Sequence, residues 1–217
     1  MKPILITVIL FGGVLGSCSS HVEQPALNFN PVAQSSKDPT SEGLPVIPYD
    51  EMLRQVAGLA KQAGIANLKD AKLSDAQTEI RIWKGFGLVY PRCFILAVSK
   101  GIPIATFTAP RVKGAKAVFR NGKAVYANTR LNAPGSGWDN LFAYLKDHGI
   151  GSTIDLALDK RYMPYPDAED LVLEMKNASH YAMVYYIDST DTADGKMALG
   201  ICQKIETEFD IHLGCQL

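Results

Sequence analysis

The chain has 217 residues, with 22 Lys and Arg against 22 Asp and Glu, so its formal net charge is zero. We find no face of clustered Lys and Arg, and binding to nucleic acid requires concentrated positive charge, so we expect no nucleic-acid partner. Hydrophobic residues make up 47% of the chain, which is enough for one sizeable core.

The first 17 residues have the three parts of a secretory signal peptide. Lys2 is their only charge, an apolar run covers residues 4–15, and Gly16 and Ser17 are small. The run is too short to cross a bilayer as a helix, which takes about 20 apolar residues. The segment Leu15-Gly16-Ser17-Cys18 resembles the bacterial lipobox, which implies cleavage before Cys18 and acylation of that cysteine. The alternative is an ordinary secretory signal followed by an incidental cysteine.

The number of acyl chains expected on Cys18 sets the strength of membrane attachment, and the segment after it has the composition of a tether. One acyl chain gives only reversible membrane binding, whereas two or three chains on Cys18 would hold the protein permanently. The segment resembles the Gram-negative lipoprotein sorting pattern, in which an Asp after the cysteine favours the inner membrane. Ser19 in that place implies the outer membrane, facing the periplasm. Residues 18–44 combine the lipidated cysteine with a Ser-, Pro-, Asn- and Gln-rich segment that cannot bury enough surface to fold. Residues 45–217 are the right length for one domain.

The hydrophobic periodicity of residues 45–217 predicts an α+β fold, in which about three helices pack on a mainly antiparallel sheet. Asn121-Gly122 is the pair favoured by a type I′ hairpin turn. The predicted helices cover 50–63, 138–148 and 195–209, the single strands 78–83, 94–98 and 104–108, the hairpins 115–128 and 171–188, and an irregular loop 162–167.

Two helix starts carry capping signals. Ser136 and Asp139 resemble a capping box before the helix at 138–148. The acidic run from Asp188 to Asp194 lacks the spacing of an EF-hand loop, so we interpret it as a cap for the last helix.

The three cysteines after Cys18 allow one disulfide bond in an oxidising compartment. Cys202 lies on the last predicted helix, and Cys215 follows beyond the end of that helix, so a chain reversal would bring them together. Cys93 opens a buried strand and is expected to be a free core residue. The alternative is that all three are free and buried. No pair has the close spacing of a zinc site.

Motifs for catalysis are lacking. The segment from Gly85 to Tyr90 begins like a dinucleotide-binding loop but lacks the third glycine and a following helix. No phosphate-binding loop, zinc-protease or serine-hydrolase motif occurs. His148, His180 and His212 belong to no catalytic motif, and we interpret them as structural or exposed. We therefore expect no catalytic residue, no metal and no cofactor.

Aromatic and basic residues gather at two places and are candidates for binding, because Tyr, Trp and Arg dominate protein interfaces. The alternative is that these rings pack under the helices as core. The candidates are Arg81, Trp83 and Arg92 around the Gly-rich turn, and Tyr181 and Tyr185 on the second hairpin.

Three blocks of the sequence, 79–96, 136–150 and 170–189, resemble a family of small bacterial proteins of unassigned function. This chain departs from the family pattern at Tyr90, Phe142 and Ala182-Met183. The resemblance implies no activity and transfers no functional residue.

Together these features predict a membrane-anchored periplasmic lipoprotein that binds an unknown envelope protein or serves an accessory role. An immunity-type inhibitor of an incoming toxin and an envelope hydrolase or transferase are the alternatives. The hydrolase would require a pocket with a carboxyl or histidine of shifted pKa.

Overall fold

The computed structural model describes residues 49–85, 90–113, 116–148, 150, 171–186 and 193–214. Several sequence predictions lie outside the described residues: the predicted signal peptide, Cys18, the predicted tether, the predicted loop at 162–167, the acidic run before Asp194, and Cys215. None of the helices that the structure describes is both long enough and apolar enough to span a membrane.

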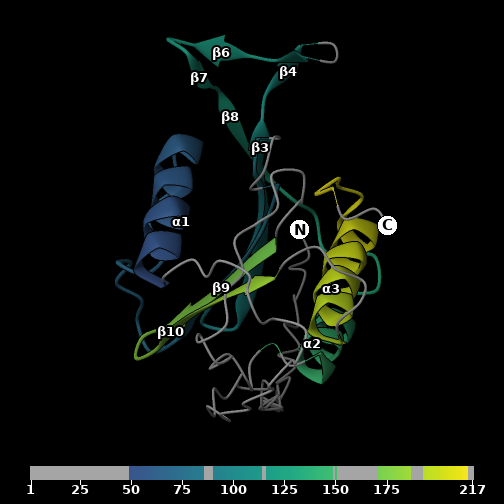
Figure 1. The fold of residues 1–217 in the computed structure, drawn as a ribbon. Coiled ribbons are helices and arrows are strands. Elements are labelled where there is room, and N and C mark those ends of the chain that lie inside the picture. Colours follow the sequence, from purple (N-terminus) through teal and green to yellow (C-terminus); the bar gives the residue numbers. More distant parts are fainter. Residues whose placement is uncertain are drawn as a thin grey trace, which may run out of the picture.

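A six-stranded antiparallel sheet forms the centre of the molecule (Figure 1). Its strand order is β10-β9-β1-β2-β3-β8, so the hairpin formed late in the chain adds to the outer edge of β1. The strands are β1 (Gln77–Lys84), β2 (Arg92–Ser99), β3 (Ile102–Pro110), β8 (Tyr126–Arg130), β9 (Leu171–Asn177) and β10 (Tyr181–Tyr186).

Helices cover both faces of this sheet. Helix α1 (Tyr49–Ala63) packs on one face, and α2 (Trp138–Asp147) and α3 (Ala193–Phe209) pack on the other (Figure 1). The α+β fold with three helices on an antiparallel sheet, predicted from the periodicity, is confirmed. The larger core lies between the sheet and the pair α2 and α3, and a second core lies beneath α1.

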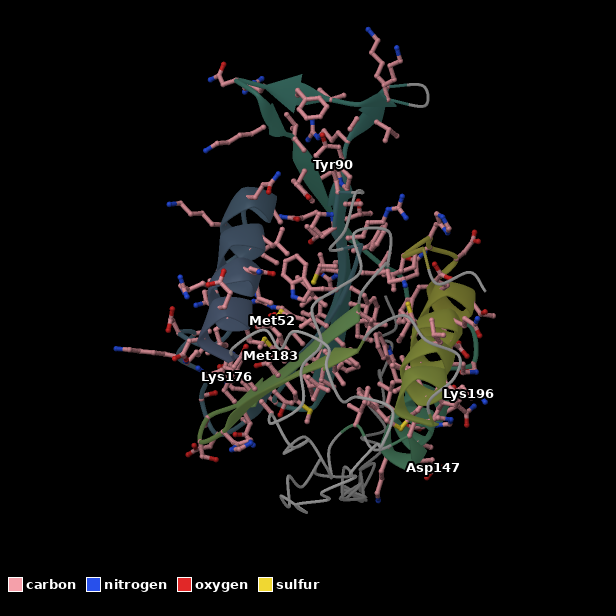
Figure 2. The ribbon with its side chains drawn as sticks, in the orientation of Figure 1. Met52, Tyr90, Asp147, Lys176, Met183 and Lys196 are labelled. Atoms are coloured by element: carbon pink, nitrogen blue, oxygen red, sulfur yellow. The ribbon has the colours of Figure 1, made fainter. Side chains whose placement is uncertain are left out.

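The alternation of β1 explains the two cores. Ile80 and Ile82 point toward α2 and α3, where they are almost completely buried. Trp83, of opposite parity, lies in the core beneath α1. That core also contains Met52 and Met183, which are labelled in Figure 2. Successive strand residues face opposite sides of a sheet, so one eight-residue strand contributes to both cores.

The predicted hairpin at 115–128 is confirmed only at its turn. Asn121 and Gly122 have φ of 51° and 73°, as a type I′ turn requires, and Arg120 pairs with Lys123 across it. The pairing ends after two residues, because the chain then turns to form other short ribbons. The short strands are β4 (Val112–Lys113), β5 (Lys116–Ala117), β6 (Phe119–Arg120) and β7 (Lys123–Ala124).

The predicted capping box at α2 is wrong. Gly137, with φ of 88°, occupies the cap position, and no side chain of the segment caps the helix. Instead the Ser136 backbone N–H donates to the Glu208 carboxylate at 2.7 Å, so α3 supplies the acceptor. The Lys204 ammonium lies 2.6 Å from the same carboxylate. Its hydrogen bond, followed by that of Ser136, lowers the pKa of Glu208 to about 2.

The structure describes the bonding state of two cysteines of the core, Cys93 and Cys202. Cys93 is a free thiol with no exposed surface, as expected from its place at the start of a buried strand. Cys202 is also fully buried and takes part in a disulfide bond. Because Cys215 lies outside the described residues, the pairing of Cys202 with Cys215 stays a prediction.

Candidate functional site

A small projection, which we call the head, extends from one end of the sheet. It comprises residues 110–125, of which the structure describes 110–113 and 116–125, and it extends from the end of β3 to the start of β8, beyond the ends of the helices (Figure 1). The base of the head is formed by three residues at intervals of seven, Arg111, Val118 and Val125. Their backbones form a ring of three hydrogen bonds of 2.7–2.8 Å, from Arg111 N to Val125 O, from Val125 N to Val118 O and from Val118 N to Arg111 O. This ring holds two short ribbons, β4–β5 and β6–β7, in one unit.

Five basic side chains give the head a strong positive charge. All five are exposed, and residues 110–125 contain no Asp or Glu. Among the residues that the structure describes, no carboxylate forms an ion pair with any of them. The five are Arg111, Lys113, Lys116, Arg120 and Lys123.

Apolar side chains stand beside these charges. Val112 is 67% exposed and Phe119 is 50% exposed, although both are large hydrophobic residues. Each has a cation next to it in sequence, Lys113 and Arg120 respectively. Single exposed apolar residues are common on protein surfaces, so it is the combination of two of them with five cations on one projection that suggests an interaction surface.

Tyrosines connect the head to the sheet. The Tyr90 ring meets the Phe119 ring edge-on at a centroid distance of 5.3 Å, and Tyr90 lies at the base of the head (Figure 2). Tyr126 follows the head and is half-buried in the core beneath α1. Burial, with a smaller contribution from Tyr90, raises the pKa of Tyr126 to about 12. The Tyr126 ring therefore stays neutral near pH 7.

The second polar group of the molecule lies inside, between the sheet and α1. Glu174 has no exposed surface and accepts two hydrogen bonds, from Trp83 Nε1 at 2.7 Å and from the Tyr181 hydroxyl at 2.8 Å. Burial raises the pKa of Glu174, although these two donors and the nearby Arg81 oppose the shift. Arg81 stands opposite Glu174 in the β1–β9 register.

Arg81 makes two hydrogen bonds of its own. Its Nε donates to the Glu79 carboxylate at 2.7 Å, and another guanidinium nitrogen donates to the Ala66 carbonyl at 2.6 Å. The guanidinium therefore joins the sheet to the segment after α1. Lys176 makes a parallel link from β9, since its ammonium donates to the Lys69 carbonyl.

The structure places three of the five predicted binding residues in this interior network. Trp83 and Arg81 are buried, and Tyr181 is half-buried with its hydroxyl on Glu174, so they hold the sheet together. Arg92 is half-buried and donates to the Leu213 carbonyl at 3.2 Å, which ties β2 to the segment after α3. The side chain of Tyr185 lies outside the description.

The contacts of this interior network indicate a structural role. Glu174 has a raised pKa, which is one mark of a general acid, but it is sealed from solvent and both of its oxygens are occupied. No group of His, Cys, Asp and Glu that could hold a metal ion occurs within the described ranges. His148 stacks on Tyr144 at 3.9 Å, which is a local helix contact.

A charge pattern in the sequence could have revealed the head. No Asp or Glu occurs between Glu79 and Asp139, whereas ten Lys and Arg lie in that stretch. The balanced total hides this asymmetry, because acidic residues elsewhere compensate. The expectation that no face carries clustered Lys and Arg is therefore wrong for the head.

Comparison of the chain with protein-family models, with curated proteins and with solved structures gives no match.

Proposed function

We propose that this protein is a lipid-anchored binding protein of the bacterial cell envelope, and that the head is its binding element. Acylated Cys18 would hold it to a membrane, and the segment before residue 45 would connect the anchor to the folded domain. The expected compartment is the periplasmic face of the outer membrane.

The observation that supports a binding role is the pairing of charge with apolar exposure on the head. Five exposed cations without an ion-pair partner among the described residues repel one another, and two large apolar side chains face water beside them. The charge does not stabilise the fold, and Val112 and half of Phe119 remain exposed although Phe119 contacts Tyr90. Both features become favourable when an anionic, partly apolar partner covers the head.

A binding role agrees better with the buried carboxyl group than a hydrolytic one does. A general acid must reach its substrate directly or through one water. Glu174 lies beneath α1 and is completely covered, and Trp83 and Tyr181 hold its two oxygens. Glu208, whose pKa is lowered to about 2, is engaged at the start of α2.

Photo-crosslinking in intact cells tests the proposal on the full-length protein. A photoreactive amino acid replaces Val112, Phe119 or Lys123 in the head, one at a time. The matched positions on the body are Lys61, Lys72 and Lys146, which are equally open to solvent.

We expect covalent adducts from the head positions and few from the body positions. A head variant with all five cations changed to Gln should lose the adducts at Phe119. Its control, with Lys61, Lys69, Lys72, Lys146 and Lys196 changed to Gln, removes the same charge from the body and should keep them. Adducts of equal yield from head and body would refute the head as binding element.

A further inference from the structure

The head differs from a protein-docking surface in size. It contains 16 residues, from 110 to 125. A standard protein interface takes about 20–30 residues from each side. A thin projection of short ribbons instead presents a few side chains at its end, which is suited to a surface that accepts shallow insertion.

The order of residue types points to the interface of a lipid bilayer. Val112 and Phe119 are the most exposed large apolar residues of the head, and Lys113 and Arg120 follow them directly. Long Lys and Arg side chains place their charge among headgroup phosphates while neighbouring apolar groups reach the acyl boundary. A soluble polyanion would neutralise the cations but would leave Val112 in water.

We propose that the head is a second membrane contact, which binds a bilayer surface rich in anionic phospholipids through its cations and inserts Phe119 and Val112 at the acyl boundary. This inference rests on the proposed function, because it names the partner of the same element.

The anchor makes even a weak contact effective. Thirty residues separate Cys18 from Tyr49, and a flexible chain of that length has an end-to-end distance of about 30 Å. A head held that close to a bilayer experiences a high effective concentration of lipid. Each Lys or Arg near an anionic surface strengthens binding about fivefold. Head contact would fix the orientation of a domain that the tether alone leaves free to rotate.

The test uses the full-length acylated protein in vesicles whose acyl chains carry bromine, which quenches tryptophan on contact. Phe119→Trp places the reporter in the head, and Lys146→Trp places a matched reporter on exposed α2. The unsubstituted protein gives the background fluorescence of the two native tryptophans, Trp83, which is buried, and Trp138. The vesicles are either wholly zwitterionic phosphatidylcholine or contain in addition about one third anionic phosphatidylglycerol.

We expect strong quenching of the Phe119→Trp reporter in anionic vesicles and little in zwitterionic ones. The Lys146→Trp reporter should remain unquenched in both. Changing Arg120 and Lys123 to Gln should lower the ratio of inserted to free head about 25-fold, since each cation contributes about fivefold. The same change at Lys61 and Lys72 should leave that ratio unaltered. Raising the salt to about 1 M, where the Debye length is about 3 Å, should release the head.

Three outcomes overturn the lipid partner. They are an unquenched reporter in anionic vesicles, equal quenching in both vesicle types, and release by inorganic phosphate at constant ionic strength. If the reporter stays unquenched while crosslinking at Phe119 captures a protein or a nucleic acid, the lipid inference fails and the head remains a binding element. If neither lipid contact nor crosslinking from the head occurs, both proposals fail.

Discussion

Trp83 and Glu174 are joined by a hydrogen bond of 2.7 Å although 91 residues separate them in the chain. The bond connects β1 to β9 beneath α1, in the same interior where Tyr181 donates to the other carboxylate oxygen. A buried carboxyl group depends on such donors, because an unsatisfied buried polar group is strongly destabilising.

Removing either donor should therefore lower stability. Trp83→Phe removes the indole N–H and leaves a gap beneath α1, and we expect the free energy of unfolding to fall by about 2–4 kcal/mol. Tyr181→Phe removes only the hydroxyl and should lower it by about 1–2 kcal/mol. Urea denaturation of both variants and of Glu174→Gln checks this. Unchanged denaturation midpoints for Trp83→Phe would contradict the network.

Glu174 and Glu208 should give opposite pH dependences of stability. Burial raises the pKa of Glu174, so the folded state binds its proton more tightly, and stability falls as pH rises from 4.5 through the raised pKa. The pKa of Glu208 is lowered to about 2, so its contribution is complete above pH 4.5 and is lost as pH falls toward 2. This contribution is at most about 3.5 kcal/mol, since the pKa falls from 4.5 to about 2 and one pKa unit corresponds to about 1.4 kcal/mol.

Denaturation at several pH values separates the two groups. Glu208→Gln should differ most from the native protein near neutral pH and converge with it in acid. Glu174→Gln should improve relative to the native protein as pH rises above 4.5. Parallel curves for the native protein and both variants would show that neither carboxyl group is coupled to folding.

Gly122 and Gly58 should respond in opposite ways to a methyl group. A Cβ at either position meets nothing within 4 Å, but Gly122 has φ of 73° in the turn of the head, whereas Gly58 lies within α1. Gly122→Ala should lower stability by about 1 kcal/mol, because the left-handed conformation is unfavourable for alanine. Gly58→Ala should raise it by about 0.5–1 kcal/mol through helix propensity. Hydrogen exchange in the head and thermal melting measure the two effects.

The thiols should be distinguishable by alkylation. Burial raises the pKa of the Cys93 thiol, and the side chain has no exposed surface, so it should react with iodoacetamide only after unfolding. Non-reducing peptide mapping of periplasmic protein should show Cys202 joined to Cys215. Recovery of both of these cysteines as alkylated thiols without reductant would contradict that bridge.

Cys18→Ala should abolish fatty-acid labelling and prevent processing before residue 18. The membrane anchor would then be lost, because acyl burial provides the attachment. Metabolic labelling with palmitate, followed by fractionation, measures both effects. Absence of label in the native protein would exclude lipidation, and the head would then be the sole proposed membrane contact.

The sequence predicts local structure well where one element decides it. The alternation of Ile80 and Ile82 gives β1, and Asn121-Gly122 gives its turn, because both depend on neighbouring residues alone. Alternation identifies the two faces of β1 but does not show which face a helix covers. The sequence alone therefore allows a binding role for Trp83, which the structure places beneath a helix. Its cover, α1, and its partner, Glu174, are both brought to it by long-range packing.

The failed cap at α2 and the interrupted hairpin have a similar cause. Glu208 reaches Ser136 from a helix more than seventy residues later, so no local motif signals it. Likewise, the seven-residue spacing of Arg111, Val118 and Val125 becomes meaningful only once their backbones close a ring. The positive charge of the head, by contrast, can be predicted from the sequence when the net charge is counted segment by segment and not over the whole chain.

The ring of hydrogen bonds at the base of the head also makes it a separable insertion. β3 and β8 already pair from Thr106 with Arg130 up to Pro110 with Tyr126, so the sheet is complete before the chain enters the head. A shorter loop between Pro110 and Tyr126 would leave both cores untouched. Other loops could therefore be grafted onto the same scaffold, so that one stable sheet would display a different recognition element on each graft.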